Sequence, residues 1–375
     1  MTVLLDSKFD LSRFAVSRRI RIALISALIS IALLITVLES QEIEGYSVLR
    51  HLRKPPSFPS ADLDAFEAPT QEGANPGRYA YATWLSSTVS DIKGGMDMKD
   101  DAYFIATRIL VWQLLHDKDT RTNSSIPVLV MCTPDVSQDR VDRLAKDGAQ
   151  IVQVEFVKNG ASWLKPGRDR WVSIMSKLRL WEFTQYSRIL YMDGDMMLKR
   201  SLDGVFEDPA AQTFNTLDNV TETTGKITVP ENYIFAGIGE VENEKHKYPP
   251  DWSDFKNQGR FNGGFFLLGP SRQMFEYYMS ILDTPNSFDS TYMEQTLLNH
   301  AHSLNGSMPW KELSSTWNIR APTMNDLKKG VASVHDKWWK TPKYDPKIAE
   351  WFKTIRWRME GFYEAYDAAL EAGAK

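Results

Sequence analysis

The sequence predicts a mixed α/β domain preceded by one membrane-spanning helix. Strand-like and helix-like segments alternate after Pro76, which is the pattern of a mostly parallel sheet wound with helices. Residues 189–192 are continuously apolar, as expected for a strand that is covered on both faces. Residues 22–38 are 17 residues without a charge, which is long enough for a short membrane span. The chain has 375 residues, 43% of them apolar, and can therefore build the large core that such a domain needs.

The alternation begins with an expected strand at residues 79–85 and an expected helix at residues 102–115. A helix at residues 173–186 should lead into the strand at 189–192, because Ile174, Leu178 and Trp181 recur at helical spacing. Between them we expect a strand, a helix and a strand at residues 127–132, 137–146 and 149–154. The first half is therefore Rossmann-like in general form. It lacks both the dinucleotide-binding glycine pattern and the P-loop, so the sequence indicates neither of these phosphate-binding motifs.

Residues 22–38 are interpreted as an uncleaved signal anchor, since the sequence after them offers a poor cleavage site. Arginines precede the span and glutamates follow it, so residues 1–21 should be a cytoplasmic tail and the rest should lie in a lumen. A short span favours the thinner membranes of the secretory pathway, with the Golgi as the expected location. Prolines and charges at residues 39–76 indicate an extended stem. Three potential N-glycosylation sites agree with a luminal domain: Asn123, Asn219 and Asn305.

The tripeptide Asp193-Gly194-Asp195 follows the apolar strand directly. Ligands of open α/β sheets collect at the carboxyl ends of such strands. The spacing puts both carboxylates on one side of an extended backbone, and the glycine lets a ligand approach closely. Such a pair can hold a divalent cation against a diphosphate. The tripeptide is also an ordinary turn sequence, so the motif alone leaves both interpretations open.

Four ordered blocks make residues 79–339 similar to glycosyltransferase family 8, the glycogenin-like nucleotide-sugar transferases. The blocks are a lysine helix at 176–188, the Asp-x-Asp strand, residues 202–206, and a strand at 261–271. The resemblance implies a GT-A fold with a mixed central sheet, which we assign to residues 77–343. It favours a membrane-anchored, fungal-type member of the family. Residues 344–375 should form an amphipathic terminal helix that packs on the domain more readily than on a membrane.

The resemblance implies a metal site of Asp193, Asp195 and His335 that binds Mn2+, with Mg2+ as the alternative. A hydrogen-bonded histidine near a core edge is the alternative for His335. The family often places a glycine between this histidine and a later lysine, whereas here Lys337 follows by two positions. Whether Lys337, Lys340 or neither contacts phosphate therefore stays open.

The resemblance also implies a UDP-sugar donor, and Lys177 would reach its sugar and phosphate. A solvated surface lysine is the alternative. The uridine pocket would be lined by Thr83, Leu85 and Tyr103, each of which could equally be a packing residue. Further donor contacts are expected from Gly194, Asn262, Gly263 and Asp289, and a helix cap is the alternative for Asp289.

Glu294 and Gln295 take the place of an Asp-Gln pair that is common in the family. The family retains anomeric configuration, and we expect a same-face substitution in which Glu294 or Gln295 stabilises the cationic sugar. A covalent route through Glu294 is the less favoured alternative. The implied acceptor is a glycan, glycolipid or glycoprotein, and a homodimer is an open question. The acidic portion beyond the span argues against a nucleic acid partner.

Two competing classes of function remain. A glycoside hydrolase would also use paired carboxylates, but it needs neither an Asp-x-Asp metal site nor a nucleotide pocket. A catalytically silent carbohydrate-binding membrane protein would fold normally and tolerate replacement of Asp195.

Overall fold

The computed structural model describes residues 78–87, 96–157, 163–168, 171–217, 229–340 and 345–373. The chain divides into one compact unit of residues 66–365 and a second that combines residues 1–65 with 366–375. Of the second unit, only the helical residues 366–373 are described. The predicted tail, membrane span and stem lie outside the described residues. Within the described ranges, no helix is both long and apolar enough to cross a membrane.

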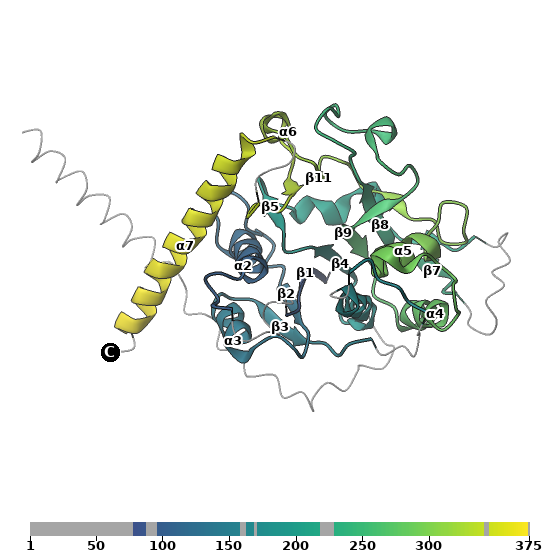
Figure 1. Ribbon diagram of the computed structural model, residues 1–375, viewed down its shortest axis with the longest axis horizontal. Coiled ribbons are helices and arrows are strands. Elements are labelled where there is room, and N and C mark those ends of the chain that lie inside the picture. Colours follow the sequence, from purple (N-terminus) through teal and green to yellow (C-terminus); the bar gives the residue numbers. More distant parts are fainter. Residues whose placement is uncertain are drawn as a thin grey trace, which may run out of the picture. The chain divides into compact units, whose positions relative to one another are not determined.

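A seven-stranded mixed sheet lies at the centre of the unit of residues 66–365 (Figure 1). Its strand order is β10-β8-β9-β4-β1-β2-β3. Strands β3, β2, β1 and β4 run parallel, whereas β9 is antiparallel to both β4 and β8. The predicted α/β class with a mixed central sheet is therefore confirmed. In chain order the strands are β1 Tyr79–Leu85, β2 Val128–Cys132, β3 Gln150–Gln153, β4 Arg188–Met192, β8 Phe235–Gly239, β9 Phe261–Leu268 and β10 Lys311–Glu312.

Helices cover both faces of this sheet, and alternate strand residues point to each. On one face, Ala82 and Tyr191 pack with α4 and α5 and with the 3₁₀ segment η5. On the other face, Tyr81 and Leu190 pack with α2 and α3. This two-sided burial explains why the strand before the aspartates is continuously apolar. The helical elements named here are α2 Ala102–Leu115, α3 Gln138–Lys146, η5 Ser173–Glu182, α4 Arg272–Leu282 and α5 Glu294–Ala301.

Two smaller sheets complete the unit. One has the strand order β11-β12-β5, with β5 Met196–Leu198, β11 Asn318–Arg320 and β12 Ser333–His335. The other pairs β6 Phe214–Asn215 with β7 Asn232–Tyr233. Short helical elements lie between the strands: η6 Asp203–Glu207, η7 Pro209–Ala211, η8 Trp252–Asp254, η9 Ser290–Tyr292 and α6 Met324–Lys329.

The expected elements of the first half are found close to their predicted positions. The bounds of β1 and α2 agree with the prediction, and Asp101 caps α2 by accepting from the N–H groups of Tyr103 and Phe104. The helix expected at 173–186 is shorter, because η5 is a run of 3₁₀ turns that ends at Glu182. Phe183 leaves the helical region with φ −81° and ψ 55°, which lets the chain turn into β4.

The carboxyl-terminal helix α7 spans Ile348–Gly373. Its residues up to 365 belong to the same unit as the sheet. There Phe352 and Met359 are buried, and Arg358 pairs with Asp117, which follows α2, over 2.5 Å. This part of the helix therefore packs on the domain through an apolar stripe and a charged contact.

Candidate active site

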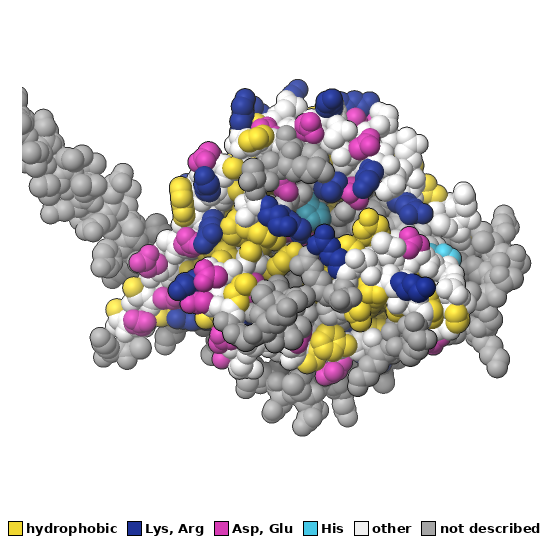
Figure 2. All heavy atoms as spheres, in the orientation of Figure 1, with side chains coloured by type: hydrophobic (Ala, Val, Ile, Leu, Met, Phe, Trp, Pro, Cys, Tyr) yellow, Lys and Arg dark blue, Asp and Glu magenta, His cyan; other side chains and the backbone are white. Residues whose placement is uncertain are grey.

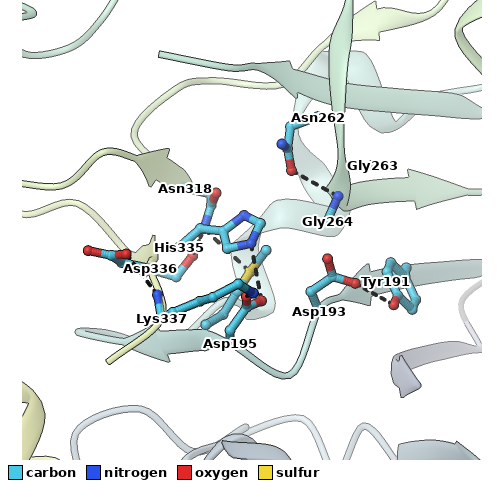
Figure 3. A network of polar contacts seen from close by, with 12 residues as sticks. Tyr191, Asp193, Asp195, Asn262, Gly263, Gly264, Asn318, His335, Asp336 and Lys337 are labelled. Atoms are coloured by element: carbon cyan, nitrogen blue, oxygen red, sulfur yellow. Dashed lines mark hydrogen bonds and ion pairs between the residues drawn. The ribbon is translucent and has the colours of Figure 1, made fainter. Parts of the chain in front are cut away.

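Asp193-Gly194-Asp195 lies at the carboxyl end of β4, where the chain turns into β5 (Figure 3). Because β9 is antiparallel to β4, the amino end of β9 lies at the same sheet edge. There the Asp193 N–H donates to the Gly264 carbonyl over 2.8 Å. Asp193 is half-buried and Asp195 is buried.

His335 ends β12, whose register with β5 pairs it with Met196. Its Nε2 lies 3.1 Å from Oδ1 of Asp195, as Figure 3 shows. Asp193, Asp195 and His335 each offer one ligand atom, and these atoms lie within 4.8 Å of one another. Burial lowers the pKa of His335, but the Asp195 carboxylate outweighs burial and raises that pKa above its ordinary value. Two carboxylates and one imidazole are a donor set that suits a divalent transition metal.

Gly264 and Gly194 keep the space beside these ligands open. A Cβ on Gly264 would lie 2.5 Å from Cε1 of His335 and 2.8 Å from Oδ2 of Asp193. A Cβ on Gly194 would lie 3.0 Å from the Thr107 hydroxyl. In addition, Nδ1 of His335 is buried without a hydrogen-bond partner among the described residues. The three ligands and the close backbone approach fit a bound cation.

Lys177 is buried beside this cluster, which excludes the surface-lysine alternative. Its ammonium group lies 2.8 Å from Oδ1 of Asp193 and 3.0 Å from Oε1 of Glu294. Burial lowers the pKa of Lys177, but the two carboxylates outweigh burial and hold that pKa well above its ordinary value. Burial also raises the pKa of Glu294, against the opposing charge of Lys177. The Tyr191 hydroxyl donates to Oδ1 of Asp193 over 2.6 Å and helps to fix this carboxylate.

Lys337 reaches the same site from the segment after β12. Its Nζ lies 2.6 Å from Oδ2 of Asp195 and over the rings of Tyr103 and Trp339. Burial raises the pKa of Asp195, but His335 and Lys337 outweigh burial and hold that pKa well below its ordinary value. Of the two lysines left open by the sequence, Lys337 therefore faces the aspartates, whereas Lys340 is exposed.

The amino end of β9 and the start of α5 contribute further side chains to the site. The Gly263 N–H donates to Oε1 of Gln295 over 2.8 Å, and the Gly264 N–H donates to Oδ1 of Asn262 over 2.9 Å. These bonds orient both amide side chains toward the backbone of β9. Glu294 begins α5, next to Gln295, and is buried.

These groups share one cavity of about 330 Å³, within the range of small-molecule sites. In Figure 2, a histidine ring is visible between lysine and arginine side chains near the middle of the face shown. Of the residues predicted from the sequence, the cavity is lined by Leu85, Tyr103, Lys177, Asp193, Gly194, Asp195, Asn262, Gly263, Glu294, Gln295, His335 and Lys337.

Two predicted site residues lie outside the cavity lining. Thr83 is buried within β1, and its hydroxyl has no hydrogen-bond partner among the described residues. Its neighbour Trp84 lines the cavity instead, with its indole N–H donating to the Ser176 hydroxyl over 2.8 Å. Asp289 is exposed and caps η9 by accepting from the backbone N–H of Thr291, as its helix-cap alternative requires.

Sequence reasoning missed several residues of the site. Tyr191 and Gly264 stand within two positions of predicted residues, so the motifs themselves were the available signal. Three others, Arg168, Trp171 and Tyr292, also line the cavity. They come from loops or from single 3₁₀ turns, which are too short for a periodic pattern to distinguish them from other surface residues.

Comparison with known proteins agrees with the features described above. The model of a family described as glycosyl transferase family 8 matches residues 98–338. An uncharacterised protein of Schizosaccharomyces pombe is 26% identical over 310 residues, covering 74% of this chain and 78% of that protein. Galactinol synthase 2 of Arabidopsis thaliana is 26% identical over 221 residues, covering 59% of each protein.

Two solved structures align with part of this chain. An active-site mutant of LgtC aligns with a TM-score of 0.43 and 13% identity, covering 74% of this chain and 94% of that one. Mouse xyloside xylosyltransferase 1 aligns with a TM-score of 0.41 and 12% identity, covering 69% and 97%.

Proposed function

The chain belongs to glycosyl transferase family 8, and we propose that it transfers a sugar from a UDP-sugar to a glycan, glycolipid or glycoprotein acceptor. Membership of this family makes the chain a glycosyltransferase. We propose in addition the donor, the acceptor, the retained anomeric configuration and the metal. One observation carries it. The Asp193, Asp195 and His335 cluster shares a cavity with the buried pair Lys177–Glu294.

The cation would be held by Asp193, Asp195 and His335. Two carboxylates and one imidazole favour Mn2+, and Mg2+ is the alternative. When bound, the cation supplies Lewis-acid stabilisation of the negative charge that develops on the leaving diphosphate. Gly264 leaves room at this point, because a side chain there would overlap two of the three ligands.

Lys177 and Lys337 bring positive charge to the same end of the cavity. Lys177 stays protonated, since two carboxylates hold its pKa above the ordinary value. A buried, preorganised charge stabilises developing negative charge more strongly than a solvated one. Lys337 is half-buried and its ammonium group contacts Asp195, so we expect it to bind phosphate oxygens of the donor. Tyr103 and Leu85 would bind the base.

Glu294 would act on the sugar side of the reaction. It is buried, and it contacts the ammonium group that also contacts Asp193. A carboxylate there stabilises positive charge at the anomeric carbon while the diphosphate departs. Gln295 and Asn262 are held by backbone N–H groups of β9 and would contact sugar hydroxyls. We favour a same-face substitution in which the leaving phosphate helps to deprotonate the acceptor.

We also propose that the catalytic unit works in the lumen of the Golgi or another secretory membrane, anchored through residues 22–38. The uncharged run, the arginines before it and the stem-like composition of residues 39–76 support this. Fusing a glycosylation tag to either end of the full chain tests the orientation. Modification at the amino terminus alone would refute it.

The experiment that tests the function is a donor panel. UDP-GlcNAc, UDP-glucose and UDP-galactose are incubated with the protein and Mn2+, and UDP release is measured. We expect one donor to be cleaved, EDTA to stop cleavage, and added Mn2+ to restore it. Asp195→Asn should abolish release, whereas Asp139→Asn, which changes an exposed acid on α3, should not. If no donor is cleaved and none binds, the donor assignment fails.

The same assay separates the competing classes. A glycoside hydrolase would cleave glycosides without a nucleotide, and EDTA would leave its activity unchanged. A silent binding protein would show no release with any donor, and Asp195→Asn would leave its sugar binding intact.

A further inference from the structure

One wall of the cavity has no role in the proposed function. Trp171 and Tyr292 face each other there with ring centroids 5.7 Å apart, and both line the cavity. The Arg168 guanidinium lies 5.4 Å from the Trp171 ring centroid and lines the same cavity. Tyr292 is 50% exposed, so half of this residue is open to solvent at the cavity.

Backbone contacts hold the two segments of this wall together. The Gly167 N–H donates to the Thr291 carbonyl over 2.9 Å, and the Lys165 N–H donates to the Ser290 hydroxyl over 2.8 Å. A Cβ on Gly167 would lie 3.1 Å from both the Thr291 carbonyl oxygen and the Trp171 ring. A side chain at this position would therefore crowd both groups, and the backbone bonds hold the two segments close together.

Met293 determines which way the residues on either side of it point. Its φ of +46° lies in a region that a residue with a side chain rarely adopts. The Met293 side chain is buried in the core, which holds the unusual backbone in place. As a result Tyr292 is exposed at the cavity, whereas Glu294 is buried beside Lys177. Strained backbone of this kind is concentrated at functional sites.

We infer that Trp171, Tyr292 and Arg168 form a binding platform for a pyranose ring of the acceptor. The apolar C–H face of a pyranose packs on aromatic rings, and the guanidinium supplies N–H donors for its hydroxyl groups. Tyr292 ends η9, two residues before Glu294, and the Gly167 N–H bond to the Thr291 carbonyl holds the Arg168 and Trp171 segment beside it, so a ring bound there lies on the sugar side of the reaction. The cation ligands come from other elements, the turn after β4 and the end of β12. This inference rests on the proposed function, since it assigns the acceptor class of the same cavity.

The test is direct binding of methyl α- and β-hexopyranosides, measured by titration calorimetry with UDP and Mn2+ present. The wild type should bind members of the panel, and Trp171→Ala and Tyr292→Ala should each weaken binding about tenfold. Tyr292→Phe should restore it, because the ring face is kept. Trp357→Ala is the matched control, since Trp357 is 63% exposed on α7 and does not line the cavity.

A second measurement separates failure of the platform from failure of the proposed function. UDP with Mn2+ should raise the Tm of the wild type and of each variant, which also shows that the variants fold. Absence of this rise in the wild type would contradict the donor site. A normal rise without any pyranoside binding, or with binding that the alanine variants do not weaken, would overturn the platform alone.

Discussion

Replacing Gly264 with alanine should disturb the proposed metal site without removing any of its three proposed ligands. The added Cβ would lie 2.5 Å from Cε1 of His335, 2.8 Å from Oδ2 of Asp193 and 3.0 Å from Oδ1 of Asn262. Ordinary contacts begin near 3.4 Å, so the histidine ring must move by about 0.9 Å and the carboxylate by about 0.6 Å. A displacement of this size in a catalytic constellation lowers turnover about 100-fold.

Two measurements follow the Gly264→Ala variant. Mn2+ affinity, from titration calorimetry, should fall about tenfold, as for other changes beside metal ligands. Turnover, from UDP release at saturating Mn2+, should fall about 100-fold. The Tm should fall as well, since overpacking costs about 1–3 kcal/mol.

The control for this variant is Gly361→Ala on α7. A Cβ on Gly361 meets no atom of the described residues within 4 Å, so this change should leave metal affinity alone and stabilise the helix by about 0.5–1 kcal/mol. Gly264→Ala with near-normal Mn2+ affinity and turnover would show that the ligands do not act from the positions described, and the site assignment would have to be abandoned.

Three further predictions concern charge and burial. Lys177→Met should abolish UDP release and destabilise the fold by about 3–5 kcal/mol, because it leaves Asp193 and Glu294 without the ammonium group that pairs with them. Adding Glu294→Gln to this variant should recover stability in urea titrations but should not recover activity. Burial lowers the pKa of His302 from 6.5 to about 4, so the unfolded chain binds more protons between these values. The free energy of unfolding should therefore fall by about 3 kcal/mol as the pH drops from 7 to 4, and an unchanged pH slope in His302→Gln would contradict this. Arg358→Ala should lower the Tm, because it removes the partner of the buried Asp117. The control Lys353→Ala, on an exposed turn of α7, should leave the Tm unchanged. Equal effects of the two variants would rule out a stabilising role for the Arg358–Asp117 pair.

The periodic half of the fold was predictable, because strands and helices that pack on two faces leave regular apolar patterns. The bounds of β1 and α2 show this most clearly. The three-stranded sheet of β5, β11 and β12 was not predicted, since strands of three residues are too short to show a period. The 3₁₀ geometry of η5 was missed because its apolar spacing also fits an α-helix.

At the site, the residues that lie in recognisable sequence motifs could be predicted, and those outside such motifs could not. The convergence of Asp193, Asp195 and His335 was expected through a family resemblance, and the structure brings the three together. Thr83 was placed in the uridine pocket, but the structure turns Trp84 to the cavity instead. Tyr292 could not be found from the sequence, because its exposure depends on a positive φ at a methionine, which no propensity indicates.

The antiparallel register of β12 with β5 places His335 opposite Met196, so a late part of the chain completes a site that an earlier part begins. During synthesis, the Asp-Gly-Asp turn and the parallel strands leave the ribosome long before β12 exists. Until then the chain has two of the three proposed ligands and an uncovered edge on β5. A chain that stops before β12 would thus carry the family's most recognisable motif and still lack a complete cation site. Genome surveys that count enzymes by Asp-x-Asp alone would misclassify such a chain, whereas a search that also requires the histidine strand would not.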